Sequence, residues 1–338
     1  MKQGDNMSPN LFNVYINDLL ENIDESCKPV TLQNMSMNCL MFADDILLLS
    51  ETPEGLQNSI NKLNSYCNKW QLTINTQKTK IMVFQQKNIL YNKYDFYLNG
   101  DKLEKVLKYK YLGNIIEASG KLTSSHTELA KKGTKVLFSI FKYLSPLENV
   151  SIKLYKKLFE SLVKPILMYN SEIWYMDFYE KIIRAERRAQ IKDMSKFDIL
   201  AMIDSSQVEK THLKFCKYIL GLSKQSVNIA ARAELAQYPI DVFIKVQSLK
   251  YLARISSDEN NPLLYDAFCL SKWLSTNGIF SWFSYVENIA NVNKLDINKI
   301  QDINYKQEKR SFSKNIKKEL KDSFENIFFE KLKLTNET

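Results

Sequence analysis

Glycine and proline are scarce in this chain, which has 8 glycines and 7 prolines among 338 residues. This scarcity argues against a loop-rich or disordered protein. Hydrophobic residues make up 45% of the sequence, enough to form a substantial core. The length predicts two domains or one large domain.

Cysteine and histidine are also few and scattered. The five cysteines form no CxxC pair and no cluster with either of the two histidines. A zinc site and a disulfide framework are therefore not expected, and an intracellular protein with free thiols is favoured. The sequence does not distinguish the nucleus from the cytoplasm.

Long apolar runs are absent, because Lys or Asn interrupts each one before it reaches membrane-spanning length. The N-terminal "MKQGDNMSPN" lacks the apolar core of a signal peptide, so no membrane partner is expected. Lys and Arg exceed Asp and Glu by 47 − 38 = 9, a net charge of +9. This excess is consistent with a polyanionic partner such as nucleic acid.

The first part of the chain, residues 1–120, reads as mixed α/β. Ser8 is a predicted N-cap for a helix over 8–20, with Pro9 at its first position, and a second helix is predicted from Thr52. Residues 80–84 and 109–116 each read as one strand. Asn99-Gly100 predicts the turn of a hairpin.

After residue 120 the pattern changes to amphipathic helix almost throughout. "SIKLYKKLFESLVKPILMY" reads as a helix with one basic face, "VEKTHLKFCKYILG" as another that ends near Gly221, and 305–334 as a lysine-rich helix. Such lysines either bind nucleic acid or form an ordinary solvated face. The lysines considered for nucleic-acid binding are Lys153, Lys156, Lys157, Lys210, Lys214 and Lys217.

The stretch "LMFADDILLLS" places Asp44 and Asp45 between two apolar, strand-like runs. A hairpin with both aspartates at or near its tip is predicted. Mg²⁺ is commonly held by one or two carboxylates together with substrate phosphates, so the pair suits a metal site for phosphoryl transfer. The alternative is a polar turn, because Asp is common in turns.

Four ordered segments, "KQGDNMSPNLFNVYINDLL", "LMFADDILLLS", "WQLTINTQKTKIMVF" and "YLG", together resemble the reverse transcriptase of non-LTR (LINE-type) retrotransposons. The helical segments that follow also look like the downstream region of such polymerases. The resemblance covers most of the chain, with 177–206 and the tail after about residue 275 less clear.

The resemblance implies roles for several residues. Asp44 and Asp45 would be catalytic carboxylates at a Mg²⁺ site, and Lys78 would neutralise or protonate the leaving pyrophosphate. Lys2, Gln3 and Gly4 would lie against the nascent base pair and template, and Tyr111, Leu112 and Gly113 would form the turn that grips the primer. Without the resemblance, an exposed lysine at a strand end is the favoured interpretation of Lys78. The alternative for Gln3-Gly4 is a frayed terminus.

The fold that the resemblance implies is α+β. It consists of a partial reverse-transcriptase palm at 1–120, a helical thumb-like region at 121–205 and a basic C-terminal helical region at 206–338. The family function is RNA-directed DNA synthesis, with an RNA template and a DNA primer as partners. In the family, a first catalytic aspartate and the fingers precede the segment beginning "KQG", so the chain is expected to be inactive alone. The alternatives are a retained nucleic-acid-binding protein and an unselected fragment.

Overall fold

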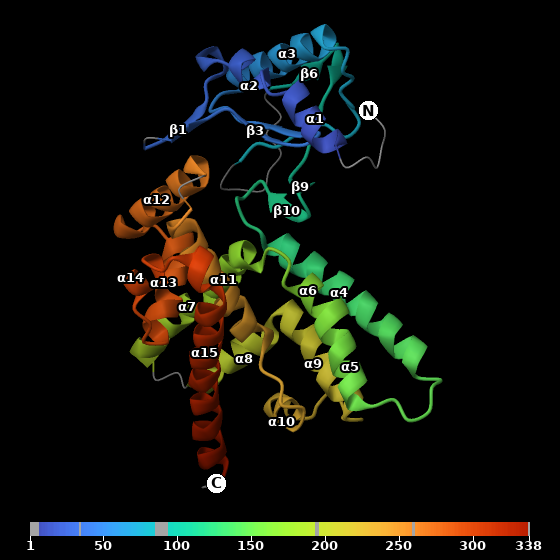
Figure 1. The fold of residues 1–338 in the computed structure, drawn as a ribbon, viewed down its shortest axis with the longest axis vertical. Coiled ribbons are helices and arrows are strands. Elements are labelled where there is room, and N and C mark those ends of the chain that lie inside the picture. The colour runs from blue at the N-terminus through green and yellow to red at the C-terminus, as the bar shows by residue number, and fades with distance from the viewer. Residues whose placement is uncertain (1–6, 34, 85–93, 193–195, 259–260, 337–338) are drawn as a thin grey trace. The chain divides into compact units, whose positions relative to one another are not determined.

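The computed structural model describes residues 7–33, 35–84, 94–192, 196–258 and 261–336 (Figure 1). The chain forms two compact units. Unit 1 comprises Met1–Lys110 and Glu117–Gly120, and unit 2 comprises Tyr111–Ile116 and Lys121–Thr338. Helices and small two-stranded sheets make up unit 1, whereas unit 2 is almost entirely helical. The finer division at residue 205 stays a prediction.

The helices of unit 1 are α1 (Ser8–Tyr15), α2 (Leu19–Asn22) and α3 (Pro53–Lys69), with a 3₁₀ turn at Glu25–Cys27. The predicted single helix over 8–20 is wrong, because the chain breaks after Tyr15 and Met7 replaces Ser8 as the N-cap. Ile16 and Leu19, on either side of the break, are both buried. The predicted start of α3 is confirmed, since the Thr52 side chain accepts a hydrogen bond from the Gly55 N–H.

The strands of unit 1 pair in twos. Antiparallel pairs join β1 (Val30–Leu32) to β2 (Met35–Met37), β3 (Cys39–Phe42) to β4 (Asp45–Leu48), and β6 (Tyr97–Leu98) to β7 (Asp101–Lys102). A parallel pair joins β5 (Lys80–Ile81) to β8 (Glu104–Lys105). The predicted Asn99-Gly100 turn is confirmed, with φ of 52° and 85°, and the predicted strand over 80–84 is shorter than expected.

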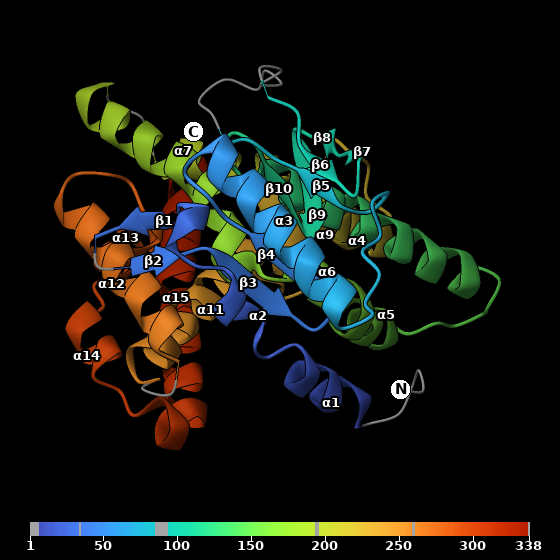
Figure 2. The same cartoon turned by 90° about the horizontal axis from the view of Figure 1, so that it is seen from above.

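Helix α3 holds unit 1 together by packing against two small cores. Tyr66 and Cys67 on α3 join α2 and the β3–β4 hairpin in one cluster, and Figure 2 shows α3 lying along β4. Ile60, two turns before Cys67 on α3, packs with Ile81, Phe96, Leu98 and Leu103 in the second cluster. The hairpin is therefore fixed from one side by a long helix.

Residues 108–117 form a hairpin of β9 (Lys108–Tyr111) and β10 (Asn114–Glu117), so the prediction of one strand over 109–116 is wrong. Leu112 and Gly113 make the two-residue turn, with φ of 45° and 85°. Positive φ at both central positions is what a type I′ turn requires. Gly takes this conformation readily and Leu does not, which hides the turn in the sequence.

Unit 2 is built from twelve α-helices and one π-helical turn within its described residues. They are α4 (Thr123–Leu144), α5 (Ile152–Leu158), the π-helical turn η2 (Phe159–Val163), α6 (Lys164–Leu167), α7 (Ser171–Lys192), α8 (Lys196–Ser205), α9 (Gln207–Ile219), α10 (Asn228–Glu234), α11 (Ile240–Ser256), α12 (Pro262–Thr276), α13 (Trp282–Val292), α14 (Ile297–Gln301) and α15 (Tyr305–Asn336).

One hydrophobic cluster runs through unit 2, from Leu129 on α4 to Leu320 on α15. Helix α11 lies at its centre and packs against α7, α13 and α15; the last of these runs beside α11 in Figure 1. The predicted lysine-rich helix at the C-terminal end is confirmed as α15. Gly221 ends α9 as predicted, with φ of 63°, and the Leu222 N–H donates to the Lys217 carbonyl.

The predicted helix over "SIKLYKKLFESLVKPILMY" is continuous in direction but changes type at η2. Pro165 has no N–H and cannot bond the carbonyl four residues earlier, so a regular α-helix would lose a bond there. The chain changes to a π-helical turn just before Pro165, where the regular hydrogen-bond pattern cannot continue.

In the described part of the chain, no helix is both long enough and apolar enough to cross a membrane. All five cysteines are free.

Candidate functional site

Asp44 and Asp45 lie at the tip of the β3–β4 hairpin, as the sequence predicted. Ala43 and Asp44 form the two-residue turn, and Phe42 pairs directly with Asp45 across the hairpin. Ala43 takes a φ of 52°, the positive value that the first central residue of a primed turn needs. Both aspartate side chains are exposed, and among the described residues neither makes a hydrogen bond or ion pair.

The two faces of this hairpin differ because side chains alternate along a strand. One face packs against α2 and α3 and carries Cys39, Met41, Ile46 and Leu48. The other face carries Leu40, Phe42, Asp45 and Leu47, and Phe42 is 62% exposed there. The packed face fixes the hairpin, while the open face and the turn present the carboxylates.

This arrangement fits a hard divalent cation. Two adjacent, unpaired carboxylates on a rigid turn are what a Mg²⁺ site with few protein ligands needs, since phosphates and water supply the remaining ligands. Within the described residues, no group of three or more His, Cys, Asp or Glu side chains could hold a metal ion. Asp44 and Asp45 are thus a pair of exposed carboxylates without a third such side chain beside them in the described residues.

Lys78 lies in a turn between α3 and β5 and is exposed. The Asn75 carbonyl and side chain both accept hydrogen bonds from the Lys78 N–H, and the Lys78 carbonyl accepts one from the Tyr109 hydroxyl. The backbone is therefore fixed while the ammonium group is free to reach a ligand. No described contact joins Lys78 to the two aspartates.

The Leu112–Gly113 turn is held by a tyrosine that the sequence did not single out. The Tyr169 hydroxyl donates to the Leu112 carbonyl at 3.1 Å. The Tyr169 ring lies so close to Gly113 that an added Cβ would stand 2.8 Å from its Cε1. Tyr169 is held in turn by Trp174, whose indole N–H donates to the Tyr169 carbonyl.

The strand after this turn is bound to α4 through one serine. The Ser125 hydroxyl accepts from the Ile115 N–H at 2.5 Å and donates to the Ile115 carbonyl at 3.0 Å. The Ser125 side chain thereby satisfies the Ile115 N–H and carbonyl, as a neighbouring strand would. Tyr169 and Ser125 together fix the backbone of residues 112–115.

The lysines predicted to contact nucleic acid differ in how free they are. Lys153, Lys157, Lys210 and Lys214 are exposed. The Lys156 ammonium donates to the Leu235 carbonyl at the end of α10, and that of Lys217 donates to the Lys224 carbonyl. Lys156 and Lys217 therefore hold backbone in place, and their role in binding nucleic acid stays a prediction. Lys2, Gln3 and Gly4 lie outside the described residues.

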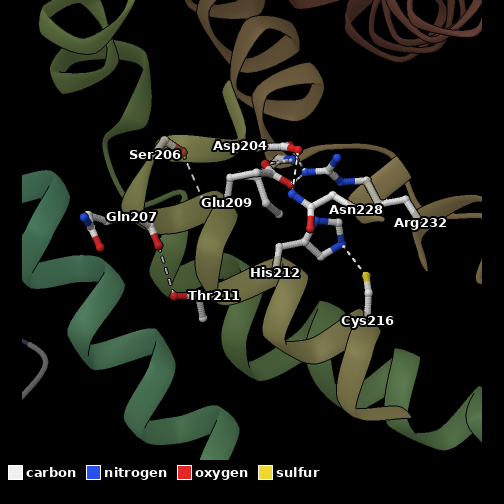
Figure 3. A network of polar contacts seen from close by, with 10 residues as sticks. Asp204, Ser206, Gln207, Glu209, Thr211, His212, Cys216, Asn228 and Arg232 are labelled. Carbon is white, nitrogen blue, oxygen red and sulfur yellow. Dashed lines mark hydrogen bonds and ion pairs between the residues drawn. The ribbon is translucent and has the colours of Figure 1, made fainter. Parts of the chain in front are cut away.

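The sequence analysis did not detect a buried polar network on α9 (Figure 3). Glu209 accepts hydrogen bonds from Arg232 at 2.7 Å and from the Ile240 N–H, and its carboxylate lies 2.9 Å from Nδ1 of His212. Arg232 also bonds Asp204. The signal for it was a polar residue at every third or fourth position of an otherwise apolar helix face, at Glu209, His212 and Cys216.

The network is structural rather than catalytic. Cys216 Sγ lies 3.6 Å from His212 Nε2, so the order thiol, imidazole, carboxylate is present. All three side chains are buried, so no substrate can reach the sulfur. Burial lowers the pKa of His212, but the Cys216 sulfur and the Glu209 carboxylate outweigh burial and raise it to about 9. The group thus joins α8, α9, α10 and α11 through charge.

Comparison with known families matches residues 1–116 to the family described as "Reverse transcriptase (RNA-dependent DNA polymerase)". The chain is similar to an uncharacterized transposon-derived protein of Caenorhabditis elegans, with 29% identity over 40% of this chain and 48% of that protein. It is 29% identical to the retrovirus-related Pol polyprotein of the type-2 retrotransposable element R2DM of Drosophila melanogaster, over 38% of this chain and 13% of the polyprotein.

A third similar protein is the Pol polyprotein of the type-1 retrotransposable element R2 of Popillia japonica. Identity is 26% over 50% of this chain and 28% of that polyprotein. The chain therefore matches about half or less of the length of these relatives. No solved structure matches the chain.

Proposed function

Residues 1–116 belong to the reverse transcriptases of non-LTR retrotransposons, and from that premise we propose that this chain contributes to RNA-directed DNA synthesis. The observation that carries the proposal is the position of Asp44 and Asp45. Within the segment that matches the family, they form an exposed carboxylate pair on a hairpin whose other face is packed. In this proposal unit 1 is part of a polymerase palm and the first helices of unit 2 act as a thumb.

Asp44 and Asp45 are the residues that would hold Mg²⁺. Mg²⁺ would supply the chemistry of the family's two-metal site, in which one ion activates the attacking hydroxyl of the primer and the other stabilises the leaving oxygen, and the two aspartates would form part of that site. The hairpin contributes rigidity, because the packed face holds the turn in one geometry.

Lys78 and the Leu112–Gly113 turn would contact the substrates. The Lys78 ammonium would neutralise the pyrophosphate that leaves, and its fixed backbone would limit where that charge can move. The turn would support the primer strand, held in place by Tyr169 and Ser125. The partners are then an RNA template and a DNA primer.

The metal site can be tested by iron-mediated cleavage. Fe²⁺ would occupy the Mg²⁺ site, and ascorbate with peroxide would generate radicals that cut the backbone nearby. We expect a cut close to residues 44–45 that is suppressed by excess Mg²⁺ and lost in Asp44→Asn and Asp45→Asn. A deoxynucleoside triphosphate should strengthen the cut and an unphosphorylated nucleoside should not, because phosphates complete the coordination of the ion.

Asp101→Asn is the matched control. Asp101 is also exposed and also begins the second strand of a two-residue hairpin, β6–β7. The cut near residues 44–45 should persist in this variant. The proposal would be contradicted by a cut that is equally weak in Asp44→Asn, Asp45→Asn and Asp101→Asn. It would also be contradicted by a cut whose strength does not change when the nucleotide is added.

A further inference from the structure

Helix α15 brings a group of lysines together on unit 2. Lys317 lies at the centre of this group. Its Nζ is 5.4 Å from the centroid of the Phe243 ring on α11, and the Nζ of Lys164 is 3.2 Å from the same centroid. The two ammonium groups are therefore at most 8.6 Å apart, the sum of 5.4 and 3.2 Å.

These lysines lie close enough to lower one another's pKa. Burial lowers the pKa of Lys164, and Lys317 and Lys321 lower it further, against the opposing effect of Glu160. Burial, Lys309 and Lys317 lower the pKa of Lys250. Burial and Lys317 likewise lower the pKa of Lys321, with Glu325 and Glu160 acting against them. The α15 lysine patch is defined as Lys164, Lys250, Lys309, Lys317 and Lys321.

Within the described residues, Lys164 forms an ion pair with Glu160, and Lys250, Lys309, Lys317 and Lys321 form none. Like charges gathered without enough carboxylates destabilise the folded state, and an anionic partner removes that cost. Three of these side chains lie on aromatic rings, Lys164 and Lys317 on Phe243 and Lys321 on Tyr238 with its Nζ 4.0 Å from the ring centroid, so their positions are constrained.

A hollow of about 500 Å³ lies beside Lys164, one member of this patch. Lys164 and Tyr169 both line it, together with Glu160, Asn170 and Gln247. Tyr169 is the residue whose hydroxyl bonds the Leu112 carbonyl. Tyr169 therefore touches both the turn and the hollow that Lys164 lines.

We propose that the α15 lysine patch binds the phosphate backbone of an RNA–DNA hybrid that leads away from the Leu112–Gly113 turn. The choice of a hybrid rests on the proposed function. The patch itself needs only closely spaced phosphates, which pair with ammonium groups and release condensed counterions. This surface is distinct from the helices α5 and α9 that the sequence pointed to.

Lysine footprinting tests the proposal on the full chain. The protein is treated with an acetylating reagent with and without a short RNA–DNA hybrid, and modified lysines are located by mass spectrometry. We expect several-fold protection of Lys309 and Lys317 and none of Lys318, which is also exposed on α15. EDTA is present throughout, so failure of the Asp44–Asp45 metal site would leave this result unaffected.

Binding measured against salt concentration gives the second readout. Lys317→Gln should reduce the slope of log affinity against log salt by about one, because one phosphate contact is lost. Lys318→Gln, the matched control on the next residue, should leave the slope within error. Neither residue is buried, so both variants should fold, which thermal melting checks.

Three results would overturn the proposal. One is equal slopes for the two variants. Another is protection confined to the exposed lysines of α5 and α9, which would place the hybrid there instead. The third is equal protection of Lys309 and Lys317 by polyglutamate, which would show that the patch accepts any polyanion and does not select a nucleic-acid backbone.

Discussion

The two histidines of the chain, His126 and His212, are both buried and yet have pKa values on opposite sides of the ordinary value of 6.5. Burial, together with Lys181 and Lys210, lowers the pKa of His126 to about 4. The neutral ring stacks on Trp174 and accepts from the Val208 N–H. His212, between Glu209 and Cys216, is instead held charged.

The free energy of unfolding should therefore depend on the two histidines in opposite pH ranges. His212, with its raised pKa, stabilises the fold fully below pH 6.5, and this contribution is lost as the pH rises through about 9. His126, with its lowered pKa, contributes fully above pH 6.5, and its contribution is lost as the pH falls through about 4.

We expect the destabilisation caused by His212→Gln to shrink by roughly 3 kcal/mol between pH 6 and pH 10. That caused by His126→Gln should shrink by a similar amount between pH 7 and pH 4, so each variant is the control for the other. Urea denaturation across this range measures both. Parallel pH profiles for the two variants would contradict the assignment of opposite charge states.

Among the elements, the β9–β10 turn depends on a residue far away in the sequence. Leu112 holds a φ of 45°, which is unfavourable for a branched side chain, and the Tyr169 hydroxyl holds its carbonyl. Tyr169→Phe removes that hydrogen bond and should cost about 1 kcal/mol of local stability.

Amide hydrogen exchange measures this effect directly. Exchange should become several-fold faster at the turn in Tyr169→Phe and remain unchanged in Tyr143→Phe, where an exposed tyrosine has no described partner. Unchanged exchange at residues 112–114 in Tyr169→Phe would show that Ser125 alone fixes the strand.

The contact between α4 and α6 depends on the absence of a side chain at Gly133. A Cβ added there would stand 2.4 Å from Cδ2 of Leu167 and 3.1 Å from its Cγ. Gly133→Ala should therefore destabilise unit 2 by roughly 1–3 kcal/mol, even though Ala favours a helix.

Shortening the opposing side chain provides the control for this contact. In Gly133→Ala with Leu167→Ala, the added methyl group occupies part of the space that Leu167 leaves. The double variant should then be less destabilised than the sum of the two single variants. Simple additivity in denaturation experiments would show that the two positions do not meet.

At the scale of the whole molecule, the two units have separate cores. The cluster from Leu129 to Leu320 contains no residue of unit 1, and the two clusters around α3 contain none of unit 2. Each core therefore stabilises its own unit.

We expect residues 108–338, which keep the whole β9–β10 hairpin, to fold without the rest of unit 1. Their thermal unfolding should be cooperative, with a midpoint close to one of the transitions of the full chain. A protein of residues 121–338, which lacks the strand bound by Ser125, is the comparison and should melt earlier. Gradual melting of residues 108–338 would show that unit 1 is required for this core.

The β3–β4 hairpin and the long helices could be predicted from sequence because apolar periodicity determines both. The β9–β10 turn could not, because its positive φ at Leu112 is stabilised by Tyr169, 57 residues away. The Glu209–His212–Arg232 network was equally inaccessible, since the partners come from different helices. The roles of Asp44, Asp45 and Lys78 came from a family resemblance, and the fold supplies a position for each.

The β3–β4 hairpin is also sensitive to whether an insertion in β4 adds an odd or an even number of residues. Only four residues of β4 separate the turn from the next loop, and alternate ones serve the core and the open face. Insertion of one codon after Asp45 would send Leu47 into the core and turn Ile46 and Leu48 outward, whereas insertion of two would restore their orientation. Sequences that keep this hairpin should therefore tolerate insertions or deletions of two codons here. A change of one codon would mark a copy in which the hairpin no longer holds Asp44 and Asp45 in place.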